Sequence, residues 1–376
     1  MNQVEYPRQI TTLQAAAILI STIIGVGVLA LPHFAARAAD TGAPLVTFLA
    51  ICLASFGLWV ITKLGMLYPN HSIILYSEYI LGKWPARLGS VMVILFFAVL
   101  TSLAAREFGE VVITSVLKNT PLEVTVIVML LLATIAARND MTTFAYVHHL
   151  YLPLILGPVI LIVMLSLKNS DILFLQPIWG NQPQNMVGGV LIIAALFQGS
   201  FIQTIVIPAM RRPDRAMKAS FWGMFIAGGL YFSIVIAVVG VFGPEEIKKL
   251  LWPTLELAKT TTLPGNILER LDAAFLAVWV TAVFTTLFSS YYLTIHAVSK
   301  LFRLRDHKVF SLFILPFLFA MAMVPQNILQ MYQVIEIIGQ WGLLITILYP
   351  LLLLVVARFR KRKESANENP QKDASP

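Results

Sequence analysis

The sequence has few charged side chains and almost no cysteine, and each shortage excludes a class of protein. Only 12% of its 376 residues are Asp, Glu, Lys or Arg, while 58% are hydrophobic, and the mean hydropathy is +0.80. A soluble domain has about 25% charged and about 45–50% apolar residues, so a soluble protein is excluded. The single cysteine, Cys52, lies in an apolar run, so no disulfide can form within the chain. The composition indicates an integral membrane protein.

Motifs for catalysis and for cofactors are also missing. The sequence contains no P-loop, no H-E-x-x-H, no C-x-x-C and no G-x-S-x-G. We therefore expect no enzyme activity, no cofactor and no bound metal. The first ten residues are polar and no cleavage pattern follows them, so we expect no cleavable signal peptide. The net charge of +8 fits cytoplasmic loops of a membrane protein, and we expect no nucleic-acid partner.

Apolar runs long enough to cross a lipid bilayer, about 20 residues each, recur along the chain. If both termini face the cytoplasm, 19 Lys and Arg residues fall on the inner side and 7 on the outer side, and Arg106 lies within a span. Basic residues favour cytoplasmic loops, so we predict this orientation. We expect a ten-span domain over residues 1–357 and a basic, disordered cytoplasmic tail over residues 358–376. The ten runs cover roughly 11–37, 43–68, 87–117, 121–138, 142–167, 186–209, 219–243, 267–299, 308–324 and 333–357.

Two of the ten runs are interrupted where a regular helix would be more stable. The first contains STIIGVGVLALPHF, residues 21–34, and the sixth contains the polar step Gln198-Gly199-Ser200. In a helix interior, glycine costs about 1 kcal/mol and proline about 3 kcal/mol relative to alanine. Breaks in corresponding positions of two five-span halves are typical of inverted-repeat transporters, in which the unwound backbone lines a binding site. The alternative is that these small residues serve close helix packing.

These breaks lead to a prediction for the fold and for the ligand site. We predict an all-α membrane protein with ten transmembrane helices in a 5+5 inverted-repeat transporter fold, with helices one and six broken. Open N–H groups at the half-helix starts would bind an anionic group, and open carbonyls at the half-helix ends would bind an ammonium or another cation. Neither broken run contains a charged residue, so we expect a neutral zwitterion such as a small or apolar amino acid; a neutral sugar or nucleoside is the rival.

Two further runs supply polar candidates. In span eight, Thr285 and Thr286 belong to a hydroxyl-rich stretch that favours a polar cavity wall, although such hydroxyls often bond to their own helix. In span three, Arg106 and Glu110 are spaced i, i+4 and can pair, while Glu107 points elsewhere. We expect this charged group to lie in the outer half of the membrane, as a gate, a subunit contact or an interfacial anchor. His148 and His149 are candidates for a proton relay, although interfacial histidines without such a role are commoner.

Four stretches, GVGVLALP, LGKW, LLWPTLEL and ERLDAAFLAVWV, together resemble the B subunits of bacterial endospore germinant receptors, members of the amino acid/polyamine/organocation transporter superfamily. The resemblance covers about residues 8–357. It implies a ten-span subunit in the inner membrane of the spore that binds a nutrient germinant and triggers germination together with A and C subunits. It implies ligand contacts at Gly25, Val26, Gly27, Leu100, Thr101, Gln198, Gly199, Thr285 and Thr286, to which the break in span six adds Ser200.

The resemblance leaves more than one function open. A sensing receptor subunit would respond to its ligand by a conformational shift that is passed to its partners. A proton- or sodium-coupled amino acid symporter would use the same fold, and a structural subunit that passes only water or ions is a third possibility. No strong coupling carboxylate lies near the breaks in the sequence, which favours the receptor. The identity of the germinant does not follow from the resemblance.

Overall fold

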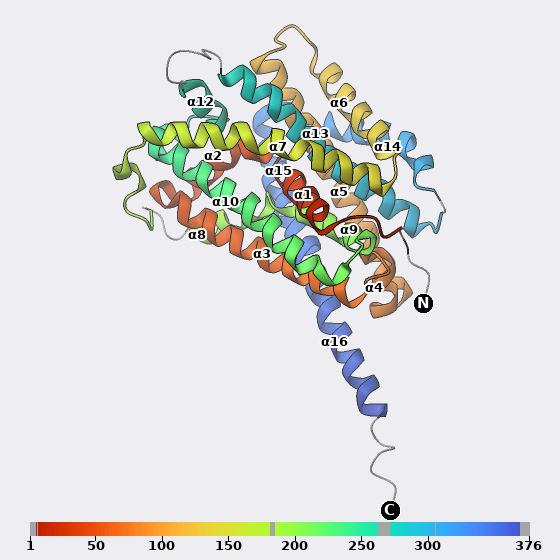
Figure 1. Ribbon diagram of the computed structural model, residues 1–376. Helices are drawn as coiled ribbons and strands as arrows, with labels where there is room; N and C mark the ends of the chain where they lie inside the picture. Colours follow the sequence, from red (N-terminus) through yellow and green to blue (C-terminus); the bar gives the residue numbers. More distant parts are fainter. Residues whose placement is uncertain (1–4, 6, 181–184, 262–270, 305, 369–376) are drawn as a thin grey trace, which may run out of the picture.

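The structure of this chain, a computed structural model, describes residues 5, 7–180, 185–261, 271–304 and 306–368 (Figure 1). Over these residues the regular structure is helical, apart from an isolated bridge between Ile10 and Met210. The α-helices are α1 (Thr12–Ile23), α2 (Gly27–Ala39), α3 (Ala43–Leu67), α4 (Ile73–Leu81), α5 (Lys83–Ser115), α6 (Leu122–Ala137), α7 (Met141–Ser166), α8 (Met186–Ala195), α9 (Gln203–Ala209), α10 (Ala216–Phe242), α11 (Pro244–Ile247), α12 (Pro253–Thr260), α13 (Leu271–Leu301), α14 (Lys308–Ala322), α15 (Ile328–Leu343) and α16 (Tyr349–Glu368).

Short segments of tighter or wider helix join several of these elements. The 3₁₀ turn η5 (Gln198–Ile202) links α8 to α9, and a π-helical stretch, η7 (Leu344–Leu348), joins α15 to α16. The remaining 3₁₀ turns are η1 (Asp40–Gly42), η2 (Leu167–Asn169), η3 (Ile172–Leu175) and η6 (Pro213–Arg215).

The described helices confirm an integral membrane protein. Six helical segments are long and apolar enough to cross a membrane, and a bent pair of helices makes a seventh. Three shorter apolar helices, α1, α6 and α14, lie in three more of the predicted runs. The count of ten spans and the 5+5 repeat therefore stay predictions. The six long segments are Gly27–Leu67, Lys83–Ser115, Met141–Asn169, Pro213–Phe242, Ala273–Leu301 and Ile328–Arg360.

Both predicted breaks are present in the structure. Helix α1 begins at a capping box in which Thr11 and Gln14 bond each other's backbone N–H groups, and it ends at Ile23. Helix α2 then starts at Gly27. In the sixth predicted run, α8 ends at Ala195, and its axis makes an angle of 44° with the segment Gln198–Ala209.

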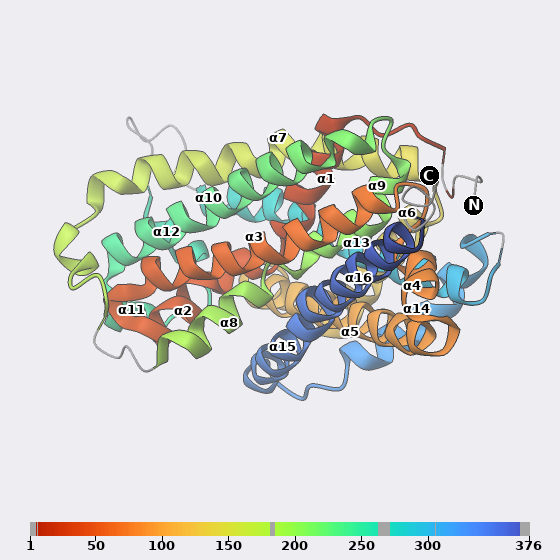
Figure 2. The same ribbon diagram turned by 90° about the horizontal axis from the view of Figure 1, so that it is seen from below.

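Helix α13 occupies the middle of the bundle, where it packs against α1, α5, α6 and α7. Helices α3 and α10 pack against each other, and α10 also packs against α1 and α7. The views in Figures 1 and 2 agree that α3, α10 and α7 run alongside one another, whereas α15 and α16 cross them obliquely. The central position of α13 brings its hydroxyl-rich stretch against the broken helix α1.

Polar contacts divide the loops into two groups at opposite ends of the bundle. At one end, Glu5 accepts a hydrogen bond from the Ser72 amide at 2.6 Å and pairs with Lys300 at 3.4 Å. At the other end, Lys248 pairs with Asp40. Hydrogen bonds to Asp40 and then to Glu245 raise the pKa of Lys248. The first set of contacts joins loops predicted to be cytoplasmic, and the second joins loops predicted to be external. Which end of the bundle faces the cytoplasm stays a prediction.

Helix α16 extends out of the bundle at the same end as the described N-terminal segment (Figures 1 and 2). Arg360 in this helix donates to the Tyr79 carbonyl at 2.8 Å. The helical backbone continues to Glu368, so part of the predicted tail is helical. Residues 369–376 of that tail lie outside the described residues, and its predicted disorder stays a prediction.

Candidate functional site

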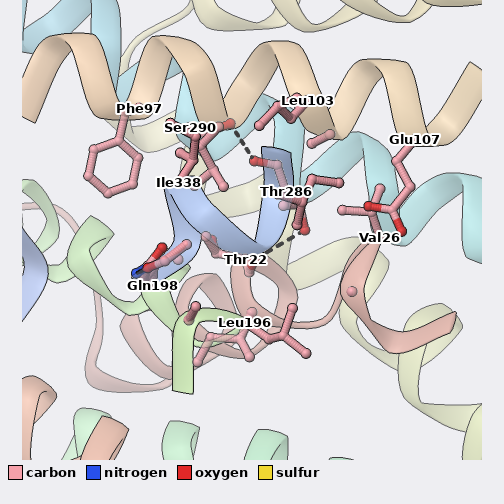
Figure 3. Close-up of a pocket in the computed structure, with 18 of the residues that line it drawn as sticks. Thr22, Val26, Phe97, Leu103, Glu107, Leu196, Gln198, Thr286, Ser290 and Ile338 are labelled. Atoms are coloured by element: carbon pink, nitrogen blue, oxygen red, sulfur yellow. Dashed lines mark hydrogen bonds between the residues drawn. The ribbon is translucent and has the colours of Figure 1, made fainter. Parts of the chain in front are cut away.

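A cavity of about 90 Å³ lies where the two breaks meet (Figure 3). A cavity needs roughly 10–15 Å³ of such volume for each water, so this one has room for several waters or one small solute. Its walls come from both broken segments and from α5, α13 and α15. The polar and charged residues that line it are Thr22, Glu107, Gln198, Thr286, Ser289, Ser290 and Glu336.

The cavity wall includes six of the ten residues predicted to bind the ligand: Val26, Gly27, Leu100, Gln198, Gly199 and Thr286. The other four, Gly25, Thr101, Ser200 and Thr285, are outside its lining. The Thr101 hydroxyl donates to the Phe97 carbonyl of its own helix at 2.6 Å. The binding role of all ten residues stays a prediction.

The carbonyl groups at the end of α1 already accept hydrogen bonds from side chains of neighbouring helices. The last carbonyls of any helix lack partners within the helix, and here they find them in α10 and α13. The side chain of Thr285 donates to the Ser21 carbonyl at 2.9 Å, and that of Thr286 donates to the Thr22 carbonyl at 3.1 Å. Tyr231 donates to the Ile23 carbonyl at 2.7 Å, and Trp279 donates to the Gly25 carbonyl at 3.3 Å. Each of these carbonyls thus has one side-chain donor and keeps a second lone pair, so the expectation that they bind an ammonium or another cation stays a prediction. In the second break, the Phe197 carbonyl likewise accepts from the Ser200 amide at 2.9 Å.

The start of α2 is held by the segment that carries the LLWPTLEL sequence. Pro32 lies inside α2 and has no N–H, so it cannot bond the carbonyl of Val28 four residues earlier. The hydroxyl of Thr254, from α12, donates to that carbonyl at 2.7 Å. No side chain caps the N-terminus of α2, where Val26 and Gly27 line the cavity. Pro32 therefore leaves a carbonyl at which the LLWPTLEL segment docks.

A chain of hydrogen bonds leads from the cavity to a fully buried histidine. Thr22 and Ser289, which line the cavity, share a hydrogen bond of 2.6 Å between their hydroxyl oxygens. Ser289 lies 3.0 Å from Nε2 of His148, and Ser21 lies 3.2 Å from its Nδ1. Since Ser21 donates to the Ala17 carbonyl at 2.7 Å, Nδ1 of a neutral His148 is the donor and Nε2 the acceptor. The relay role of His148 stays a hypothesis, and His149 is exposed.

The predicted pair in span three is confirmed, and its neighbour Glu107 contributes to the cavity. Arg106 binds Glu110 at 2.9 and 2.8 Å. As expected, Glu107 points away from this ion pair. It lines the cavity, and its side chain extends from α5 toward Val26 in Figure 3. It is 4% exposed. The Tyr332 hydroxyl donates to its Oε1 at 3.1 Å.

The two broken runs contain no charged residue, but two carboxylates reach the cavity from other helices, Glu107 from α5 and Glu336 from α15. One sequence feature could have indicated the role of Glu107. Arg106 pairs with Glu110 at i, i+4, which leaves Glu107 on another face of the helix without that partner. Tyr332 was also missed, and Trp252 of the LLWPTLEL segment donates to its hydroxyl at 2.7 Å.

A second pocket, of about 410 Å³, adjoins the cavity at the predicted outer end. The two share Phe34 and Glu336 in their walls, so these residues separate the pocket from the cavity. Arg37 in this pocket pairs with Glu336 at 3.7 Å. Across the described part of the chain, no cluster of three or more His, Cys, Asp or Glu residues is arranged to hold a metal ion.

Comparison with solved structures shows the fold. The chain resembles a Na⁺-coupled sialic acid symporter, solved in a substrate-bound outward-open state, with a TM-score of 0.65. The match covers 92% of this chain and 80% of the symporter, with 13% sequence identity. At this identity the likeness shows a shared transporter fold and no shared substrate.

Comparison with known sequences shows the family. The family model described as "Spore germination protein" matches residues 9–331. Spore germination protein YndE of Bacillus subtilis is 28% identical over 95% of this chain and 98% of its own length. Spore germination protein B2 of Bacillus subtilis is 26% identical over 94% and 96%, and spore germination protein GerLB of Bacillus cereus is 23% identical over 93% and 94%. This chain belongs to the spore germination protein family.

Proposed function

We propose that this chain is the ligand-binding membrane subunit of a spore germinant receptor. In this proposal it binds a small nutrient, a neutral amino acid, at the two helix breaks and triggers germination together with A and C subunits. It performs no enzymatic step. Ligand binding shifts a conformational equilibrium, and the partner subunits receive that shift. The observation that carries the proposal is the cavity between the breaks, formed by Val26, Gly27, Gln198 and Gly199.

The size and walls of this cavity support a small ligand. Pockets for drug-sized molecules measure about 300–1,000 Å³, far more than the roughly 90 Å³ enclosed here. The uncapped first turn of α2 provides backbone N–H groups for a carboxylate. Apolar side chains such as Leu100 and Ile338 cover much of the remaining wall and suit a small apolar side chain. A sugar or nucleoside would need more polar partners than this wall supplies.

The proposal includes the ten-span, 5+5 arrangement in the inner membrane of the spore, with both termini on the core side. The bent α8–α9 pair and the broken α1–α2 pair are the corresponding breaks of the two halves. The contacts that gather Glu5, Ser72 and Lys300 at one end of the bundle are consistent with an even number of crossings.

A proton- or sodium-coupled amino acid symporter is the second candidate, since the fold is shared with a transporter. Thr285 and Thr286 face carbonyls of α1, and their hydroxyl oxygens and these carbonyls are the neutral oxygen ligands that a sodium ion would use there. The buried His148 chain offers a site for a proton instead.

Two measurements test the proposal. Spores that lack this chain are assayed for loss of refractility across the twenty amino acids, several sugars and several nucleosides, and the response to one or more neutral amino acids should disappear. The purified chain in liposomes is then tested for counter-flow of the active amino acid. Binding without uptake supports the receptor, whereas concentrative or counter-flow uptake contradicts it in favour of the symporter. A deletion strain with an unchanged response to every nutrient also contradicts it.

A further inference from the structure

The polar groups around the cavity are mostly hydrogen-bond acceptors. Gln198 donates its Nε2 to the Gly339 carbonyl at 2.6 Å, and its buried Oε1 has no partner among the described residues. Thr286 and Ser290 each donate their hydroxyl hydrogen to a backbone carbonyl, as the dashed lines in Figure 3 show. Their oxygens are left with lone pairs only. A ligand that satisfies these groups has to bring donors.

Glu107 adds a negative charge to this set of acceptors. The carboxylate is 4% exposed and accepts one hydrogen bond, from Tyr332, out of about four that its two oxygens can accept. Across the described residues it forms no ion pair, because the adjacent Arg106 is bound to Glu110. A buried charge without a partner is costly, so a cation next to Glu107 would stabilise the structure.

The carbonyls of the first break are neutral acceptors and attract a cation less strongly than a carboxylate does. Each carbonyl from Ser21 to Ile23, and that of Gly25, already accepts a hydrogen bond from a side chain. Glu107 is therefore the strongest acceptor on the cavity wall. Helix α2 presents its uncapped N-terminus, at Val26 and Gly27, to the same cavity.

From this arrangement we infer that Glu107 binds a protonated amine of the ligand, so the site selects molecules that carry an ammonium group. The ammonium donates to the Glu107 carboxylate, whose position is held by the Tyr332 hydroxyl, and Gln198 Oε1 is a second acceptor within the same cavity. This inference rests on the proposed function and assigns the ammonium end of the amino acid to a side chain. A small amine without a carboxylate is recognised by the same contact.

The inference is tested by equilibrium binding to the purified full-length chain in lipid nanodiscs. The probes are L-alanine and L-valine, their amine-free counterparts L-lactate and L-2-hydroxyisovalerate, and isobutylamine. In the wild type we expect each amine-bearing probe to bind at least about 30-fold more tightly than its amine-free counterpart. Glu107→Gln should weaken binding of L-alanine or L-valine by at least about 30-fold, the loss expected when one partner of a buried charged pair is removed.

Two variants separate recognition of charge from general damage. Glu123→Gln removes the charge of an exposed carboxylate on α6, which is not part of the cavity wall, and should leave binding within about threefold of wild type. Tyr332→Phe keeps the Glu107 carboxylate but removes its hydrogen bond, and should weaken binding by about tenfold or less. The thermal unfolding midpoint of each variant shows whether it is folded. If Glu107→Gln does not fold, the relative affinities of the wild type for L-alanine and L-lactate decide whether the site selects an ammonium group.

The outcomes distinguish this inference from the proposed function. Equal affinity for L-alanine and L-lactate, or unchanged affinity in folded Glu107→Gln, overturns the inference and leaves an amino acid receptor standing. Binding of isobutylamine that depends on Glu107, without binding of any amino acid, supports the inference and removes the amino acid from the proposed function. A wild type that binds none of the three amine-bearing probes overturns the inference as well.

Discussion

Replacement of Gly25 by alanine would test whether the first break depends on close contact between α1 and α13. A Cβ atom on Gly25 would lie 2.0 Å from Oγ1 of Thr286 and 2.7 Å from its Cβ. Carbon atoms pack at about 3.5–4.0 Å, so the two segments would have to separate. Overpacking of this kind costs about 1–3 kcal/mol. Separation also breaks the hydrogen bond from Thr286 to the Thr22 carbonyl, worth about 1 kcal/mol.

The sum, about 2–4 kcal/mol, corresponds to a shift of roughly 30- to 700-fold in an equilibrium constant. We expect Gly25→Ala spores to need a germinant concentration higher by a factor in this range for half-maximal loss of refractility. The measurement is a dose-response curve with the active amino acid, with the amount of the chain in spore membranes determined by immunoblot. Gly229→Ala in α10 is the matched control, because a Cβ there has no atom within 4 Å and Gly229 is not part of the cavity wall.

A second substitution should restore the response. Thr286→Gly removes the three atoms that a Cβ on Gly25 would contact, and it adds about 1 kcal/mol for glycine in a helix. Relief of overpacking exceeds this cost by up to about 2 kcal/mol, so the double variant should recover potency by up to about 30-fold relative to Gly25→Ala alone. A normal dose-response for Gly25→Ala would refute the reasoning, because the close approach would then have no energetic consequence. A double variant no better than the single one would refute it as well.

Three further predictions concern the membrane topology, the second break and the buried histidine. With Cys52 replaced, an impermeant thiol reagent on intact cells should label a cysteine at Lys248 and leave one at Arg212 unlabelled; the reverse pattern is incompatible with the proposed orientation. Gly199→Val should abolish the nutrient response at a normal protein level, because its Cβ would lie 2.9 Å from a carbonyl oxygen of α1; a normal response would make this glycine a packing residue. His148→Leu should lower the free energy of unfolding by about 1–3 kcal/mol, since it removes the two buried hydrogen bonds that join the imidazole ring to Ser21 and Ser289; chemical denaturation in detergent measures this, and an unchanged value would mean that these hydrogen bonds contribute no stability.

The sequence alone was sufficient for features that depend on neighbours along the chain. The membrane class follows from the apolar runs, because about 20 apolar residues in succession have no stable place in water. Both breaks were located because Gly25, Gly27 and the Gln198-Gly199-Ser200 step interrupt otherwise apolar runs. The pairing of Arg106 with Glu110 was confirmed because a spacing of i, i+4 places two side chains on one face of a single helix.

Contacts between helices distant in the sequence were decided by the tertiary structure. Thr285 and Thr286 both come from the hydroxyl-rich stretch of α13, yet only Thr286 lines the cavity, because adjacent residues point in directions about 100° apart on a helix. The sequence of α13 alone does not determine how this helix is rotated about its axis relative to α1. The same rotation aims the Thr285 hydroxyl at the Ser21 carbonyl.

The charge of the site was decided in the same way. A search limited to the two broken runs finds no acidic residue, but Glu107 reaches the cavity from α5 and is held by Tyr332 from α15. The energy of a buried carboxylate depends on the donors and cations that folding brings near it, and these come from distant parts of the chain. Periodicity and composition therefore determined that the chain crosses a membrane and where its helices break, whereas the packing of α5, α13 and α15 around those breaks decided which side chains a ligand would meet.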